Sequence, residues 1–271
     1  MIYFPNAKIN FGLRVLGHRE DGFHNIQSAF IPVGWSDILE VNVLENGTSG
    51  SFNFSIIGNE IEGDDSDNLV VRAHGLLSAE YNLPEITATL LKNIPSGAGL
   101  GGGSSDGSFM LKAINDICRL GLNSESLEQY AAKLGSDCPF FIKNEPSLVT
   151  GRGEKLSKFN CPKQFLDHAI LIIFPSVGVS TAEAFSLLDS KDGEEIDFND
   201  TSTIVNDFQN SIINRVPEVA EAIKFHKKNG ANFVQMTGTG SAVFGLYSKE
   251  NPQLKIEAEE RGWRAYLGAF L

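Results

Sequence analysis

Residues 95–105, which read PSGAGLGGGSS, constrain the fold of this chain more than any other stretch. Five of the seven residues from Gly97 to Gly103 are glycine. Because glycine loses more conformational freedom on folding than any other residue, such a run suits a backbone that turns sharply or lies close to a ligand. The strand-like stretch 86–93 precedes the loop, and a helical pattern of apolar residues follows it.

This arrangement predicts a phosphate-binding loop. A loop that leaves a strand and opens a helix places main-chain N–H groups at the helix N-terminus, where the helix dipole also favours an anion. We expect Ser104 or Ser105 to cap that helix, with Asp106 in its first turn. The alternative, a flexible surface loop, does not explain why a strand and a helix flank the glycines.

Two other kinds of glycine loop fit the sequence less well. A P-loop needs a Gly-Lys pair followed by Ser or Thr, whereas this loop ends in GSS at 103–105 and contains no lysine. Gly97, Gly99 and Gly102 match the spacing of the dinucleotide-binding fingerprint. That fingerprint also needs an acidic residue about 20 positions on, at the end of a second strand. No strand-like stretch begins before about residue 138, which disfavours it.

The charge balance disfavours one class of partner. Lys and Arg number 22 against 34 Asp and Glu, which gives a formal net charge of −12. A dedicated nucleic-acid-binding protein needs a basic surface, so we expect no nucleic-acid partner. An anionic small molecule stays compatible with this balance, because a single site can be positive on an acidic protein.

The sequence also predicts a cytoplasmic protein. The three cysteines, Cys118, Cys138 and Cys161, are odd in number and match no metal-binding spacing, so we expect neither disulfides nor a metal site. The first ten residues, MIYFPNAKIN, lack the pattern of a signal peptide. No apolar run approaches the 18 residues of a membrane span, so we expect no membrane association.

The order of the predicted elements indicates an α+β fold. Predicted strands cover residues 7–16, 26–33, 38–44, 52–57, 86–93, 168–174 and 262–270, with a further strand pair around a glycine turn within 232–247. Predicted helices cover residues 104–120, 68–81, 124–134, 181–189, 203–213, 217–228 and 250–260. The segments GSDCPFFI at 135–142 and SLVTGRGEKL at 147–156 read as strand or turn.

The glycine loop resembles the second motif of the GHMP kinases, the superfamily of galactokinase, homoserine kinase, mevalonate kinase and phosphomevalonate kinase. PNAKINFGLRV at 5–15 is similar to the family's first motif, and MTGTGSAVFGLY at 236–247 to its third. The resemblance implies a two-domain GHMP kinase fold. Residues 1–152 would form an ATP-binding domain like domain 2 of ribosomal protein S5. Residues 153–271 would form a ferredoxin-like domain, whose last strand is expected to pack back on the first domain.

Four further segments narrow the resemblance within the superfamily. DGFHNIQSAF at 21–30, DNLVVRA at 67–73, LGSDCPFFI at 134–142 and NDFQ at 206–209 look like the branch that phosphorylates 4-diphosphocytidyl-2-C-methyl-D-erythritol. The implied activity is ATP-dependent phosphorylation of the 2-hydroxyl of this substrate, in the non-mevalonate route to isoprenoid precursors. The alternatives are another GHMP kinase, acting on homoserine, mevalonate or a sugar, and a non-catalytic nucleotide-binding module.

The resemblance assigns the catalytic pair to Lys8 and Asp137. Asp137, in GSDCPFF, is expected to face the substrate hydroxyl, orient it and accept its proton late in phosphoryl transfer. Lys8 shares one face of a predicted strand with Asn10, a substrate-binding candidate, because side chains alternate along a strand. A cation there offsets charge on the phosphoryl group and keeps the aspartate ionised. Without the resemblance, Asp137 reads equally well as a turn or cap residue.

The implied cofactor is ATP with Mg²⁺. Asn68 matches a position where the family contacts adenine, although it reads almost as well as a helix cap. Mg²⁺ prefers phosphate oxygens and water to a cage of protein ligands, so we name no protein carboxylate for it. The ATP phosphates are expected on the loop residues Pro95, Ser96, Gly97, Ala98, Gly99, Leu100, Gly101, Gly102, Gly103, Ser104 and Ser105.

The resemblance places the cytidine end of the substrate on aromatic residues. Phe23 and Phe185 are expected to stack on the pyrimidine, and His24 to hydrogen-bond its polar edge. The family often carries DGYH where this chain has DGFH at 21–24, so a tyrosine hydroxyl is absent while the ring remains. The implied partner is this small molecule, and the chain is expected to be a monomer or a weak homodimer. The third motif is expected near the phosphates or the substrate diphosphate through Thr237, Gly238, Thr239 and Gly240.

Overall fold

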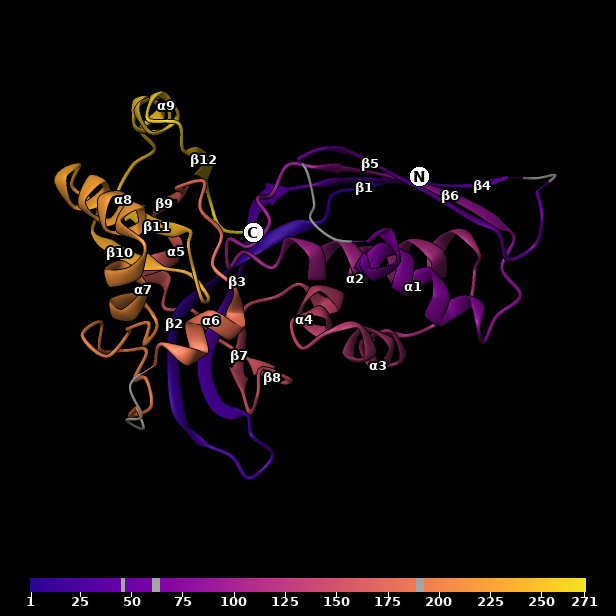
Figure 1. Cartoon of the computed structure of the whole chain (residues 1–271), viewed down its shortest axis with the longest axis horizontal. Helices are drawn as coiled ribbons and strands as arrows, with labels where there is room; N and C mark the ends of the chain where they lie inside the picture. Colours follow the sequence, from indigo (N-terminus) through magenta and orange to yellow (C-terminus); the bar gives the residue numbers. More distant parts are fainter. Residues whose placement is uncertain (45–46, 60–63, 189–192) are drawn as a thin grey trace. The chain divides into compact units, whose positions relative to one another are not determined.

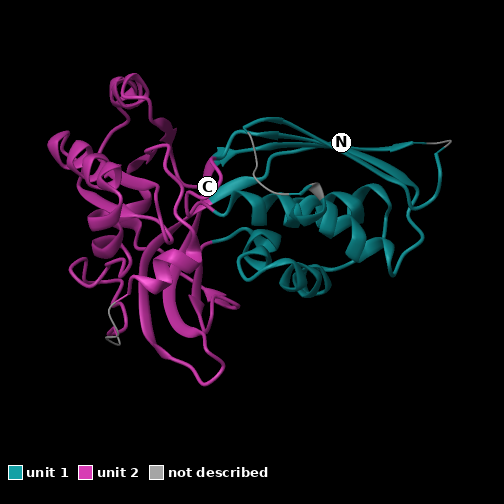
Figure 2. Ribbon diagram, in the orientation of Figure 1, with its two compact units in different colours: residues 1–7, 35–94, 101–145 teal, residues 8–34, 95–100, 146–271 magenta. Residues whose placement is uncertain are grey.

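The computed structural model describes residues 1–44, 47–59, 64–188 and 193–271 (Figure 1). The chain forms two units that are interleaved along the sequence (Figure 2). Unit 1 consists of residues 1–7, 35–94 and 101–145, and unit 2 of residues 8–34, 95–100 and 146–271. The predicted boundary between residues 152 and 153 separates the two domains of the family and does not refer to these compact units. It stays a prediction.

Unit 1 is a sheet with helices packed on one of its faces (Figure 1). The side chains of its strand β6 alternate, so that Ile86, Ala88 and Leu90 are buried while those on the other face are half-buried. The sheet has the order β1 (Ile2–Tyr3), β4 (Ile38–Leu44), β6 (Glu85–Lys92) and β5 (Phe52–Gly58). The helical elements are η1 (Asp65–Asp67), α1 (Leu69–Ser78), α2 (Gly102–Ile117), α3 (Ser124–Leu134) and α4 (Cys138–Lys143).

Helix α4 corrects one prediction, because residues 135–142 read as strand or turn in the sequence. Pro139 lies in the first turn of α4, where its fixed φ and missing N–H suit the start of a helix. Its residues from Cys138 to Ile142 are all buried. A helix that is apolar all round has no amphipathic period, so the pattern could not be distinguished from that of a strand.

Two sheets belong wholly or mainly to unit 2. The first has the order β2 (Asn6–His18), β3 (His24–Ser36), β7 (Ser147–Thr150) and β8 (Lys155–Lys158). The second has the order β10 (Phe233–Met236), β11 (Val243–Tyr247), β9 (Ala169–Phe174) and β12 (Arg264–Gly268), with antiparallel neighbours throughout.

Helices α8 (Pro217–Lys228) and α9 (Pro252–Glu260) lie in the connections between strands of the second sheet. Along the chain these elements occur in the order β9, α8, β10, β11, α9 and β12, with further helices between β9 and α8, and the strand order places β9 beside β11 and β12. This is the strand–helix–strand–strand–helix–strand arrangement of a ferredoxin-like fold. The structure therefore confirms this part of the predicted α+β fold.

The remaining helices of unit 2 are short; the last two are shorter than the sequence indicates, and the first was not predicted. They are α5 (Lys163–Leu166), α6 (Thr181–Ser186) and α7 (Gln209–Arg215). Helix α6 falls in the stretch predicted at 181–189, of which residue 189 lies outside the described residues. The helix predicted at 203–213 begins only at Gln209, because the main chain of Val205 and Asp207 hydrogen-bonds to Leu13 of β2 instead. Among the described residues, no helix has both the length and the apolar character that crossing a membrane requires.

A buried ion cluster joins β6 to α2 inside unit 1. The ammonium of Lys92 lies 2.5 Å from Oδ2 of Asp37 and 2.8 Å from Oδ2 of Asp106, and these side chains are at most 3% exposed. Oδ1 of Asp37 accepts hydrogen bonds from the main-chain N–H groups of Asn93 and Ile94. Burial raises the pKa of Asp106 well above its ordinary value, and the attraction of Lys92 offsets only part of that rise. The cluster thus fixes the backbone just before and just after the glycine loop.

His226 is a buried histidine in the core of unit 2. Its Nδ1 lies 2.9 Å from the hydroxyl of Tyr247, and Nε2 has no partner among the described residues. The ring packs against the backbone of Gly245, where a Cβ would clash with it. Burial lowers the pKa of His226 from 6.5 to about 4, because the charged imidazole would be desolvated.

We expect this histidine to make the protein less stable in acid. The unfolded chain takes up a proton near pH 6.5 and the folded chain only near pH 4, so stability is full above pH 6.5 and falls between these values. The loss amounts to about 3 kcal/mol, since each unit of pKa is worth about 1.4 kcal/mol. Urea unfolding at a series of pH values measures it. The slope between pH 6.5 and 4 should be shallower in His226→Gln, and equal slopes in the two proteins would contradict the assignment.

Candidate active site

The glycine loop has the backbone of an anion-binding nest. The angle φ is positive at every second residue, with values of 64° at Gly97, 75° at Gly99 and 71° at Gly101. Alternation of positive and negative φ turns successive N–H groups toward one side, and such concavities bind phosphate. These conformations also explain why glycine recurs at alternate positions, since other L-residues rarely adopt them.

The carbonyl groups of the loop are held by unit 2. Main-chain N–H groups of Val179, Ala242 and Lys8 donate to the carbonyls of Gly97, Ala98 and Leu100 at 3.3, 3.1 and 2.9 Å, and Oγ1 of Thr237 donates to that of Gly99 at 3.2 Å. In contrast, no main-chain N–H group from Gly99 to Ser104 has a hydrogen-bond partner among the described residues. The loop therefore presents donors while its acceptors are occupied.

The second and third motifs pack backbone to backbone within unit 2. A Cβ on Gly99 would clash with the carbonyl oxygen of Thr237. A Cβ on Gly238 would lie 3.0 Å from the Cα of Gly99, and Gly238 itself has a positive φ of 57°. The two glycines are therefore required by close approach. The predicted place of the third motif near the phosphates or the substrate diphosphate stays a prediction.

The start of α2 differs from the predicted one. The helix begins at Gly102, and its N-cap is Gly101 in the left-handed conformation, so neither Ser104 nor Ser105 is the cap. Gly101 brings no side chain to satisfy the first-turn N–H groups, which have no intrahelical partner. A serine cap would have occupied one of them. The glycine cap leaves this end of the helix able to bind an anion.

Lys8 and Asn10 lie on the same face of β2, as the sequence predicts, and both are buried. The ammonium of Lys8 donates to Oδ1 of Asn10 at 2.5 Å and to the carbonyl of Gly99 at 3.4 Å, and it lies 4.3 Å from the ring centroid of Phe30. The N–H of Asn10 donates to Oγ1 of Thr237 at 2.9 Å. Within unit 2, the cation thus contacts the carbonyl side of the glycine loop.

Two residues of the NDFQ segment support the third motif, a role that sequence reasoning did not assign. Nδ2 of Asn206 donates to the carbonyls of Met236 and Gly238 at 2.8 Å each, and Oε1 of Gln209 accepts the N–H of Met236 at 2.9 Å. Asn206 is buried. The resemblance of 206–209 to the family marks these positions, but the pairing across 30 residues is visible only in the fold.

Asp137 lies at the N-cap position of α4 in unit 1 and is half-buried. Its side chain makes no capping hydrogen bond to the helix. Asp137 thus occupies a cap position without a capping bond, and its catalytic role stays a prediction. Cys138 follows Asp137 in the chain, and its carbonyl accepts a hydrogen bond from the hydroxyl of Ser108 at 2.8 Å. This bond links the start of α4 to α2.

Asn68 does act as a helix cap. Its Oδ1 accepts the N–H of Val70 at 2.9 Å, at the start of α1. The cap uses only the oxygen of the amide, so its Nδ2 group retains its donors. The predicted contact of Asn68 with adenine stays a prediction.

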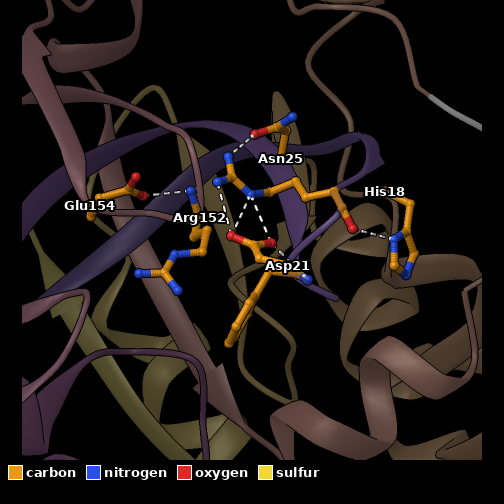
Figure 3. Close-up of polar contacts among 7 residues, drawn as sticks. His18, Asp21, Asn25, Arg152 and Glu154 are labelled. Carbon is orange, nitrogen blue, oxygen red and sulfur yellow. Dashed lines mark hydrogen bonds and ion pairs between the residues drawn. The ribbon is translucent and has the colours of Figure 1, made fainter.

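The residues predicted for the cytidine end come from two elements of unit 2. His24 begins β3, and its ring centroid lies 5.2 Å from that of Phe185 in α6, with an angle of 28° between the rings. The two rings stack on each other, so this pair does not hold a gap for a base between them. Phe23 lies at the tip of the β2–β3 hairpin and is 53% exposed. The polar contacts of this tip are drawn in Figure 3.

Comparison with known proteins places the chain in a family. A family model described as the GHMP kinases N terminal domain matches residues 68–145, and one described as GHMP kinases C terminal matches residues 184–261. The 4-diphosphocytidyl-2-C-methyl-D-erythritol kinase of Bacteroides fragilis strain YCH46 is 41% identical over 267 residues, covering 96% of each chain. This chain is a GHMP kinase.

Solved structures agree with the assignment of this GHMP kinase. A crystal structure of 4-(cytidine 5'-diphospho)-2C-methyl-D-erythritol kinase matches it with a TM-score of 0.82 at 29% identity, covering 100% of this chain and 99% of the other. The mevalonate kinase of Methanococcus jannaschii matches with a TM-score of 0.70 at 14% identity, covering 100% and 98%. The second match shows the fold alone. Together they confirm the two-domain GHMP kinase fold.

Proposed function

We propose that this GHMP kinase transfers the γ-phosphate of ATP to the 2-hydroxyl of 4-diphosphocytidyl-2-C-methyl-D-erythritol. The observation that carries the proposal is the 41% identity, over 96% of each chain, to a relative named for this substrate. A mevalonate kinase with the same fold is only 14% identical, so the fold by itself does not select the alcohol.

The ATP phosphates are proposed to bind residues 95–105. The N–H groups from Gly99 to Ser104, which have no partner in the part of the chain that the structure describes, and the glycine cap of α2 support this placement. Mg²⁺ is proposed to enter with ATP, and when bound it neutralises charge on the β- and γ-phosphates. Ser105 is our candidate for contact with it, because its buried Oγ has no partner among the described residues.

Lys8 and Asp137 are proposed as the catalytic residues. Phosphoryl transfer needs an aligned hydroxyl and stabilisation of negative charge more than covalent chemistry by the protein. Asp137 would orient the 2-hydroxyl and accept its proton. Lys8 would offset charge on the transferred group, and its contacts with Asn10 and Gly99 support that role by fixing the ammonium beside the loop.

The cytosine ring is proposed to stack on Phe23 and Phe185. An aromatic ring can stack on any base, whereas the choice of cytosine requires hydrogen bonds to its polar edge, which we propose for His24. Since His24 and Phe185 stack on each other in this structure, base binding would require one of the two rings to change rotamer.

We expect Phe185→Ala to raise the KM for the cytidine substrate about tenfold, because stacking on one aromatic ring is worth about 1–3 kcal/mol. The KM for ATP should change little. Steady-state kinetics with each substrate varied in turn measures both values. Equal changes in the two KM values would argue that Phe185 only supports the core, where its ring packs against Phe208.

An ADP-release assay tests the proposed activity. The purified protein should release ADP with ATP, Mg²⁺ and 4-diphosphocytidyl-2-C-methyl-D-erythritol, and not with mevalonate, homoserine or galactose in its place. Turnover only on one of those alcohols would replace the proposed substrate with another. ATP binding without turnover on any of them would favour a non-catalytic nucleotide-binding protein.

A further inference from the structure

The tip of the β2–β3 hairpin is organised by the guanidinium of Arg19. Its Nε and Nη2 donate to the carboxylate of Asp21 at 3.0–3.1 Å, and Nη1 donates to Asn25 at 2.9 Å (Figure 3). Oδ1 of Asp21 also accepts the N–H of Phe23, and the N–H of Arg19 donates to the carbonyl of Phe23. These bonds fix the backbone of Phe23, whereas its ring extends from the tip and is 53% exposed.

A second arginine, Arg152, covers one face of that exposed ring. It comes from the turn between β7 and β8, and its guanidinium carbon lies 4.7 Å from the ring centroid of Phe23. An arginine at this distance over an aromatic face is attracted to the ring and packs flat against it. The ring therefore has one face covered by a cation and part of its surface open to solvent.

The carboxylates near Arg152 are used by other groups. Asp21 is bound by Arg19, and the carboxylate of Glu154 accepts the main-chain N–H of Arg152 at 2.5 Å (Figure 3). Among the described residues, the guanidinium of Arg152 forms no ion pair, although its charge attracts the carboxylates of Glu154 and Asp21. Its contact with Phe23 is therefore made without a direct salt bridge beside the ring.

We propose that Arg152 is a positioning residue for the cytidine end of the substrate, and this proposal rests on the proposed function. A phenylalanine lacks a hydroxyl that could anchor its ring by a hydrogen bond. Arg152 restrains the Phe23 ring by packing on one of its faces. The other face of the ring is then available to stack on a pyrimidine. The ring would then be ordered before the base arrives, which lowers the entropic cost of binding.

Binding of CMP and CDP to the full chain, measured by calorimetry, tests this role without requiring turnover. Arg152→Met removes the charge and keeps most of the stem. Because a cation–π contact at an exposed site is worth about 0.5–1 kcal/mol, the Kd should rise about two- to fivefold, and equally for CMP and CDP. The same substitution should have no effect in a Phe23→Ala background, since the ring through which Arg152 acts is gone.

Four results would overturn the proposal. A larger loss for CDP than for CMP, or a loss that persists in the Phe23→Ala background, would mean that Arg152 binds phosphate directly. Unchanged binding of both nucleotides in Arg152→Met, with normal binding by the unmodified chain, would remove Arg152 from the site. If the unmodified chain binds neither nucleotide, the proposed function fails and this proposal with it.

Arg261 provides a matched control. Its guanidinium carbon lies 5.4 Å from the ring centroids of both Phe225 and Trp263, and it follows α9, outside every proposed site. Arg261→Met removes a contact of the same chemistry and should leave the Kd of CMP and CDP unchanged. The melting temperature of each variant, measured in parallel, shows whether that variant is folded under the conditions of the binding experiment.

Discussion

Asp137→Ala is expected to lower kcat by about 10²–10⁴-fold, the usual contribution of a positioned general base. The reason is that the substrate hydroxyl would lose both its orienting acceptor and the group that takes its proton. The KM for ATP should stay nearly the same, because the predicted phosphate contacts come from the glycine loop. Steady-state assays of ADP release on the purified variant measure both quantities.

Two comparisons make the Asp137 result specific. Asp137→Asn keeps the size of the side chain but is a far poorer proton acceptor, so it should lose activity to a similar extent. Asp167→Ala removes an exposed aspartate at the end of the short helix α5 and should turn over normally. Unchanged kcat in Asp137→Ala would remove the residue from the mechanism.

Lys92→Met is expected to destabilise the protein by about 3–5 kcal/mol, which is the cost of leaving a buried charge without its partner. Its ammonium is the cation that Asp37 and Asp106 share at 2.5 and 2.8 Å. Without it, two carboxylates would face each other away from water, and one would have to take up a proton. Urea unfolding of the variant and the unmodified chain at neutral pH measures the difference.

A surface pair of the same chemistry provides the control. Lys143 lies 2.8 Å from Glu128, but its side chain is 58% exposed, so Lys143→Met should change stability by less than about 1 kcal/mol. Adding Asp37→Asn and Asp106→Asn to Lys92→Met should recover part of the loss, because no charge then remains buried. Equal effects of Lys92→Met and Lys143→Met would show that burial is not what makes the cluster important.

The sequence was most informative about the backbone conformation of the glycine loop. Glycine at 97, 99 and 101 predicted a phosphate-binding loop between a strand and a helix, and the structure has positive φ at each of these positions. The serine cap was predicted wrongly because capping preferences describe ordinary helices. A helix that binds an anion at its N-terminus needs those first N–H groups for the ligand, and a glycine cap leaves them available.

Other parts of the molecule could not be predicted from one sequence. Lys92, Asp37 and Asp106 are distant in the chain and lie in no motif that indicates a buried charge, so only the fold shows that they meet. Asn206 lies in a segment that resembles the family, yet its contact with the third motif depends on how the chain folds back on β2. The ferredoxin-like strand order was implied by the resemblance, since spacing alone does not give the order of strands.

The interleaving of the two units has a consequence for the order of folding during synthesis. Unit 1 is complete once residue 145 has been made, whereas the hairpin of β2 and β3 belongs to unit 2 and is made first. Leu13 and Val15 of that hairpin are buried against Leu171, Phe208 and other residues that the ribosome adds much later. Any β-structure that this hairpin forms early therefore leaves Leu13 and Val15 without their apolar partners until those later residues have been made.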